Sequence, residues 1–206
     1  MMKKLLLLLG VLFEGLPMLL MLIDALHPQQ CTETYGAGTR MDIPGETMVI
    51  STSTTAERLV LDVVRDPFDI PGYQMRPEHG HIHPDQAEGF LVVNGRAQVL
   101  IGDEVHTLGP GESVIVPPNT IHHWMALDEQ PVIVEAFFEP PLQTAAWFVH
   151  FQQHIADDTM DLFQAAVISR EFPGSGPSPV EPPALVWEVL SRVMAPLGRL
   201  VGYKPC

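Results

Sequence analysis

Residues 81–95 read HIHPDQAEGFLVVNG, and this stretch decides the fold that we predict for the chain. Its apolar run has strand length and ends at Asn94-Gly95, a pair that tolerates the positive φ of tight hairpins. Similar runs follow turn residues such as Gly102-Asp103 and Gly109-Pro110-Gly111. They cover residues 59–64, 97–101, 105–108, 113–116, 122–127 and 132–138. Short strands joined by tight turns predict an antiparallel all-β barrel or sandwich, connected as a meander.

Four side chains in this region have the types and spacing of a metal site. In an extended strand His81 and His83 project from one face, and Glu88 follows after a four-residue interruption. His122 can reach them from a distant hairpin. Three imidazoles and a carboxylate suit one divalent transition metal, such as Fe, Mn, Ni, Co, Cu or Zn, and leave coordination positions open. Any one of these residues alone would be read as structural, but together they predict a metal site.

Two motifs resemble those of the cupin superfamily. The stretch from His81 to Gly95 is similar to the first cupin motif, H-x-H-x(3,4)-E-x(6)-G, and the stretch from Gly111 to His122 is similar to the second, G-x(5)-P-x-G-x(2)-H. Three positions depart from the family pattern, because Met75 and Asn119 replace glycines and Ala126 replaces an asparagine. Asparagine tolerates a left-handed backbone, so we expect the turn at position 119 to hold.

The resemblance, which covers roughly residues 69–139, implies a double-stranded β-helix, or jelly-roll. It also implies metal binding inside this all-β core by four residues, His81, His83, Glu88 and His122. Similarity to quercetin-dioxygenase-like single-domain cupins implies a metal-dependent enzyme that acts on a small, apolar, oxygenated molecule such as a phenol or enol. Dioxygenase or other oxidoreductase chemistry is the first expectation, and a catalytic role as a base is carried over to Glu88.

Two other functions stay open, because cupins share this set of residues across many activities. One is an isomerase or cyclase of small-molecule biosynthesis that uses the barrel pocket with or without metal. The other is a non-catalytic module that binds a small molecule.

Other residues of the same strands flank the predicted site. His79 precedes His81 by two residues and could line the cavity mouth or carry protons, whereas strand alternation directs His123 away from the face of His122. Most apolar residues of these strands should be core and some should line the cavity. The candidates are Phe90, Val92, Val99, Ile101, Trp124, Phe137 and Phe138. An apolar lining favours an aromatic or terpenoid-like ligand over a sugar.

The charge balance excludes one class of partner. The chain has 206 residues, a length that suits one core with appended segments, and a formal net charge of -14 from 25 acidic and 11 basic residues. Lys and Arg nowhere cluster into the basic surface that nucleic acid requires. We therefore expect a small-molecule ligand and no nucleic acid, and the negative charge also disfavours anionic lipids.

Residues 1–30 are predicted to form an N-terminal apolar helix. After two lysines, residues 5–26 are almost continuously apolar, and such a length can span the roughly 30 Å of a bilayer's hydrocarbon core. This predicts a signal or membrane anchor and places the protein at a membrane or in the secretory pathway. Glu14 opposes insertion, and no small-residue cleavage site follows. The alternative is a helix that packs on this protein or on a second subunit, which would make the protein cytoplasmic.

The chain has two cysteines, Cys31 and Cys206, which lie near opposite ends of the sequence. Two thiols alone supply neither a disulfide framework nor a thiolate zinc site. A bridge between them is compatible with an oxidising compartment, but we expect two unpaired thiols.

The pattern becomes helical after the predicted barrel of residues 40–140. Within the C-terminal extension, residues 141–206, apolar residues at helical spacing predict one helix around residues 145–152 and another around 160–167. Asp157-Asp158-Thr159 is expected to form the turn between them and to cap the second helix. Both helices should pack on the barrel.

The end of the chain combines a proline-rich stretch with an apolar helix. Residues 172–183 should be an extended linker without helical structure, and residues 184–200 should form a last helix that Pro196 bends. This tail resembles the helical extension of some single-domain cupins, which commonly pair. Its apolar surface therefore predicts a homodimer, with a lid over the barrel mouth as the alternative.

Overall fold

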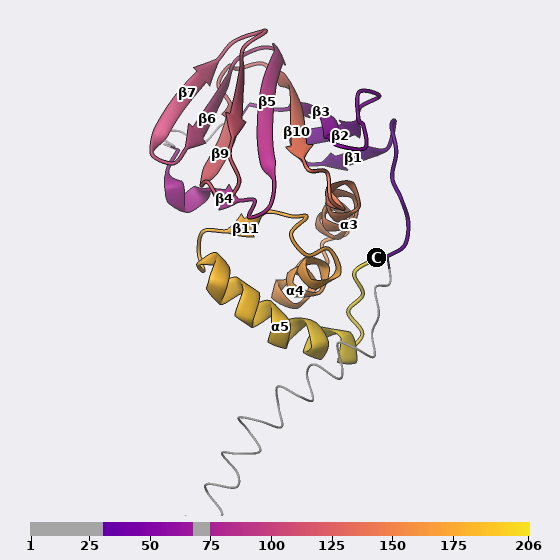
Figure 1. Ribbon diagram of the computed structural model, residues 1–206. Coiled ribbons are helices and arrows are strands. Elements are labelled where there is room, and N and C mark those ends of the chain that lie inside the picture. Colours follow the sequence, from indigo (N-terminus) through magenta and orange to yellow (C-terminus); the bar gives the residue numbers. More distant parts are fainter. Residues whose placement is uncertain (1–30, 68–74) are drawn as a thin grey trace, which may run out of the picture.

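A computed structural model of the chain describes residues 31–67 and 75–206 (Figure 1). Residues 1–30, for which we predict an apolar helix or anchor, lie outside this described part. Among the helices that are described, none combines the length and the apolar character that crossing a bilayer requires.

Two antiparallel sheets form the β core, in agreement with the predicted cupin jelly-roll. The first sheet has the strand order β1-β2-β3-β10-β5-β8, and the second has the order β11-β4-β9-β6-β7. The first comprises β1 (Arg40–Ile43), β2 (Glu46–Ile50), β3 (Leu59–Arg65), β5 (Ala87–Asn94), β8 (Ser113–Val116) and β10 (Val132–Glu139). The second comprises β4 (His81–Ile82), β6 (Ala97–Ile101), β7 (Glu104–Leu108), β9 (His122–Ala126) and β11 (Ser178–Pro179).

The core lies between the two sheets because apolar residues alternate along their strands. In β10 every second side chain is buried, from Val132 to Phe138, and the residues between them are partly exposed. Successive side chains of a strand point to opposite faces, so this alternation directs one face of the first sheet inward. Val99 of β6 and Trp124 of β9 meet it from the second sheet.

The connection between strands differs from the predicted meander. β6 and β7 do form a hairpin at Gly102-Asp103. The Asn94-Gly95 turn, in contrast, joins β5 of the first sheet to β6 of the second, and Gly109-Pro110-Gly111 carries the chain back from β7 to β8. A turn sequence fixes where the chain reverses. Which strand receives the backbone hydrogen bonds depends on burying the apolar faces of both sheets together.

Three helices follow the sheets, namely α3 (Thr144–Ala156), α4 (Leu162–Glu171) and α5 (Ala184–Leu200). α3 packs against β1, and α4 packs against both α3 and α5. α5 lies at the end of the molecule away from β7 (Figure 1). The turn between α3 and α4 is where we predict it, but the cap is Asp161, whose side chain accepts a hydrogen bond from the Gln164 backbone N–H at 2.9 Å.

The proline-rich stretch contains a strand that the sequence does not reveal. Ser178 and Pro179 form β11, which pairs with β4 at Ile82 and His81. The C-terminal extension therefore supplies an edge strand to the sheet that carries the predicted metal ligands.

The expectation of two unpaired cysteines is wrong, because Cys31 and Cys206 form a disulfide with Cα atoms 5.9 Å apart. The residues after α5 bring the C-terminus back to Cys31, whose backbone N–H donates to the Glu171 side chain of α4 at 2.8 Å. The two cysteines are 175 residues apart in sequence, so only the tertiary structure could bring them together.

Candidate metal centre

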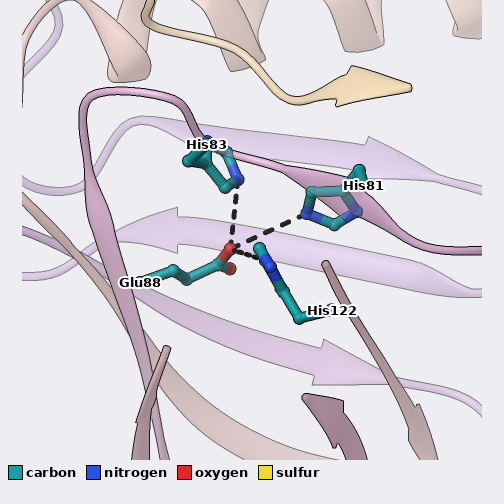
Figure 2. A group of neighbouring side chains, drawn as sticks. All are labelled: His81, His83, Glu88 and His122. Carbon is teal, nitrogen blue, oxygen red and sulfur yellow. Dashed lines mark hydrogen bonds and ion pairs between the residues drawn. The ribbon is translucent and has the colours of Figure 1, made fainter. Parts of the chain in front are cut away.

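The four predicted ligands come from three strands and one loop. His81 lies in β4 opposite His122 of β9, since these two residues are direct partners in the ladder. Glu88 lies in β5 of the other sheet. The spacing predicts that His83 shares a strand with His81. β4 ends at Ile82, however, so His83 lies just after the strand. Figure 2 shows all four side chains turned toward a common point between the sheets.

The Glu88 carboxylate is the centre of this group. Its Oε2 atom lies 2.7 Å from His122 Nε2, 3.1 Å from His83 Nε2 and 3.7 Å from His81 Nε2. One potential ligand atom of each residue lies within 4.8 Å of those of the other three. The structure therefore brings together every residue of the predicted set.

The loop that precedes His122 is held to the loop that carries His83. Asn119 has a φ of 58°, so it adopts the left-handed backbone expected of the residue that replaces a glycine. Its backbone N–H donates to the His83 carbonyl oxygen at 2.8 Å. This hydrogen bond joins the two sequence motifs beside the site.

Burial and mutual contact set the charges of the group. Burial alone would raise the pKa of Glu88, but hydrogen bonds from His122, His81 and His83 hold it well below its usual value. Burial lowers the pKa of His81 to about 4, so this imidazole is neutral at neutral pH. For His122, burial is outweighed by the hydrogen bond to Glu88, and its pKa is raised.

The orientation of the His122 ring follows from a backbone contact. Its Nδ1 atom lies 2.9 Å from the carbonyl oxygen of Thr120, and a carbonyl can only accept, so Nδ1 carries a proton and donates. Nε2 is thereby the atom turned toward Glu88. A histidine that ligates a metal through one nitrogen usually donates from the other in this manner.

This group could hold a metal ion, as expected of cupins. Imidazole nitrogens and a carboxylate oxygen are ligands that divalent transition metals accept, and these donor atoms lie within 4.8 Å of one another. Three of the four side chains are buried, and His81 is the most exposed at 29%. A ligand would therefore approach the centre past His81.

A cavity of about 210 Å³ opens beside His81, His83 and Glu88. Most of its wall is apolar, and it is supplied by strands of both sheets and by α3. From the strands come Ile43, Met48, Leu61, Val63, Trp124, Ala136 and Phe138, and from the C-terminal extension come Trp147, Phe148, Phe151, Ile155 and Pro177. Of the predicted lining residues, Trp124 and Phe138 border the cavity. α3 contributes a wall that strand patterns alone do not indicate.

Three polar side chains interrupt the apolar wall. Arg65 lies 3.4 Å from Glu46, and its guanidinium stands 4.7 Å from the centre of the Trp124 ring. Gln152 of α3 is buried, and its Nε2 atom donates to the Met48 sulfur at 3.5 Å. Among the residues that the structure describes, its Oε1 atom has no hydrogen-bond partner. Sequence reasoning missed these residues, because nothing in the local pattern indicates that β2, β3 and α3 meet at one cavity.

The two additional histidines lie outside this cavity wall. His79 is exposed in the short 3-10 turn at Pro77–His79 and does not border the cavity. His123 follows His122 in β9 and is only partly buried, in keeping with the expected alternation. Burial lowers the pKa of His123 to about 4.

One family model and several solved structures are similar to part of this chain. Residues 70–138 match a family model described as a cupin domain. KdgF from Halomonas sp. is 24% identical over 57% of this chain and 91% of its own, with a TM-score of 0.40. An RmlC-like cupin from Shewanella frigidimarina is 22% identical over 55% and 95%, with a TM-score of 0.40. The nucleoside dehydratase Pac13 from Streptomyces is 16% identical over 53% and 83%, with a TM-score of 0.38. None of the curated proteins matches.

Proposed function

We propose, from the premise that this chain is a single-domain cupin, that it is a metal-dependent enzyme acting on a small, apolar, oxygenated molecule. The metal is held by His81, His83, Glu88 and His122. Oxidation of a phenol or enol, in the manner of a dioxygenase or another oxidoreductase, is the first candidate reaction. In this proposal residues 40–140 carry the site and residues 141–206 close the cavity.

One observation supports the proposal: three imidazoles and a carboxylate converge beside a mostly apolar cavity, which His81, His83 and Glu88 border. A divalent metal in this place would supply Lewis-acid or redox chemistry. The chain's own residues bind and orient the substrate, and the aromatic wall excludes water, which strengthens electrostatic interactions within the cavity.

Glu88 is the residue proposed to move a proton. It is ionised, because its pKa is held well below the usual value, and it lies at the point where the cavity meets the three imidazoles. A carboxylate within reach of a phenol or enol hydroxyl can accept its proton and raise the electron density of the substrate.

The cavity limits the size and polarity of the substrate. Its volume of about 210 Å³ lies below the roughly 300–1,000 Å³ of pockets that hold drug-sized ligands, so a one-ring molecule fits better than a polycyclic one. Gln152 Oε1 can accept a hydrogen bond from a hydroxyl or amine on the substrate. Arg65, which also borders the cavity, offers a cation for a substrate oxygen.

A second candidate is an isomerase or cyclase that uses the same pocket without redox chemistry. This candidate is favoured by the hydrogen-bonded pair of His122 and Glu88. The raised pKa of His122 makes it the acid, and the lowered pKa of Glu88 keeps it ionised as the neighbouring base. A protein that binds the small molecule without turnover is the third outcome of the tests below.

Elemental analysis tests the metal. Full-length protein purified without added metal is compared with His81→Ala and with His79→Ala, an exposed histidine outside the cavity wall. We expect about one transition metal per chain in the unaltered protein and in His79→Ala, and loss of that metal in His81→Ala. Equal metal content in all three proteins would contradict the proposed ligand set.

Turnover of small catechols and enols then separates the candidate reactions. Consumption of oxygen that stops after chelation and returns with metal supports the oxidoreductase. Product that forms without oxygen and survives chelation supports the isomerase or cyclase. Saturable binding of these probes without any product supports the binding module.

A further inference from the structure

The last helix presents its apolar side to the surface. Along α5 the residues at 185, 189, 193 and 197 follow at intervals of four and are all Leu or Val, and Leu185 and Val189 are 77% and 57% exposed. We call the exposed residues of this side the α5 stripe. It consists of Leu185, Val186, Val189, Leu190, Val193, Leu197, Leu200 and Val201.

Packing on α4 fixes which side of α5 faces outward. On the inward side Ser191, Ala195 and Gly198 are buried, and Trp187 and Met194 pack on the buried cluster that α4 and α5 share. A Cβ on Gly198 would lie 3.1 Å from Val167 of α4, so the two helices approach closely there. Arg199 is buried and pairs with Glu171 at 3.4 Å. The helix therefore cannot turn the stripe inward without breaking this interface.

The α5 stripe has the composition of a contact surface rather than of a surface exposed to water. Surface helices normally direct their large apolar residues to the core, whereas α5 leaves its Leu and Val side chains exposed and buries Arg199. A contiguous exposed apolar patch of this kind marks contact with a protein or a membrane. Arg192 is the charged residue at its edge, where it pairs with Glu188 at 2.8 Å.

The disulfide shows where the remaining chain attaches. Cys206 follows α5 by a few residues and is bonded to Cys31, so residues 1–30 join the molecule at the C-terminal end of that helix. Residues 5–26, the apolar stretch long enough to span a bilayer, end five positions before Cys31. Five residues reach at most about 18 Å, so the apolar stretch is tied within that distance of Cys31 and of the C-terminus that follows α5.

We propose that the α5 stripe lies on a phospholipid bilayer into which residues 5–26 insert. The apolar residues of that stretch are nearly continuous, so a helix formed from them would be apolar on every side, and contact with the stripe alone would leave most of it in water. A second copy would cover the stripe but not this stretch. A bilayer covers both, since an amphipathic helix settles with its apolar side in the interface.

The disulfide agrees with this orientation. Disulfides persist in oxidising, extracytoplasmic spaces, which is the side on which a chain with a lysine-flanked N-terminal anchor places its folded part. The net charge of -14 gives no attraction to anionic lipid, so the contact is apolar and insensitive to salt. α5 then lies along the membrane, with the sheets on its far side (Figure 1).

Spin labels on the full-length chain in phosphatidylcholine vesicles test the proposal. Val189→Cys and Leu197→Cys place a nitroxide on the stripe, and Val105→Cys on β7 is a matched control, since Val105 and Val189 are valines exposed to 50% and 57%. Oxygen concentrates in lipid and a nickel chelate stays in water. We expect the ratio of oxygen to nickel collisions to be several-fold higher at both stripe positions than at Val105, and unchanged by salt. An intact disulfide and an unchanged melting temperature show that each variant is folded.

Three results would overturn it. Nickel access at the stripe equal to that at Val105 places the helix in water. Low access to both reagents, with dipolar broadening between labels, assigns the stripe to a second copy. Low access to both without broadening, in detergent as well as in vesicles, assigns it to residues 5–26 of the same chain.

Discussion

His122 Nε2 lies 2.7 Å from the Oε2 atom of Glu88, although the two residues belong to different sheets. Both side chains are buried, and burial alone would favour the neutral carboxyl. Hydrogen bonds from the three imidazoles hold the pKa of Glu88 well below its usual value, so the carboxylate stays ionised. The geometry of the proposed metal centre depends on this pair.

Glu88→Gln is expected to weaken metal binding while leaving the barrel folded. The change keeps the shape of the side chain but removes the charge that compensates a divalent ion. Mutation of a residue that only hydrogen-bonds to a metal ligand lowers metal affinity by about 10–100-fold, so loss of the ligand Glu88 itself should lower it by at least about 100-fold. Isothermal titration calorimetry with Zn(II) or Mn(II) measures this affinity. Glu104→Gln, at an exposed glutamate on β7, should bind as the unaltered protein does; a Glu88→Gln protein with full affinity would remove Glu88 from the ligand set.

Gln152→Leu is expected to stabilise the ligand-free protein and to weaken its binding of small polar aromatics. Gln152 Oε1 is buried without a partner, so leucine of similar volume relieves a penalty of about 1 kcal/mol. Gln86→Leu is the matched control, because the Oε1 atom of this buried glutamine also lacks a partner among the described residues, but its Nε2 atom donates to Pro140 and Thr144 at 2.6 and 2.8 Å. It should destabilise by about 1–3 kcal/mol. Urea denaturation compares the two, and destabilisation by Gln152→Leu would mean that this amide has a structural role.

Gly176→Ala is expected to disturb the cavity wall. A Cβ at this position would lie 2.2 Å from the Trp147 indole, and Trp147 is buried beside Phe151 with ring centroids 4.4 Å apart. The indole must move, which costs about 1–3 kcal/mol when a filled core is overpacked. Chemical denaturation and the tryptophan emission spectrum report both effects. Gly36→Ala meets open space and should change neither; similar behaviour of the two variants would argue against a tight Trp147 contact.

Cys206→Ser is expected to lower the free energy of unfolding by about 2–5 kcal/mol, because the bridge restricts a long loop of the unfolded chain. A reductant should lower the stability of the unaltered protein by a similar amount and have no effect on the variant. Melting curves with and without the reductant provide the measurement. If neither the substitution nor the reductant changes the melting temperature, the protein does not contain the disulfide.

Much of the site follows from sequence because its spacing is local. The pair at His81 and His83, the glutamate five residues later and the loop before His122 are short-range patterns, and each matches the order of the cupin motifs. The strands from β3 to β10 follow in the same way from alternating apolar residues and turn residues. Local patterns also place α3, α4 and α5, since apolar residues recur there at helical intervals.

The sequence by itself determined the strands from β3 to β10, the helices α3, α4 and α5, and which four side chains could share a metal. Only the tertiary structure decided that β5 and β6 belong to different sheets, that Cys31 meets Cys206, that Gln152 faces the cavity and that α5 turns its apolar side outward. The physical reason is the separation along the sequence over which each interaction acts. Backbone propensity and side-chain alternation act over a few residues, whereas these outcomes depend on contacts between residues far apart in sequence, which form only when all the apolar faces are buried together.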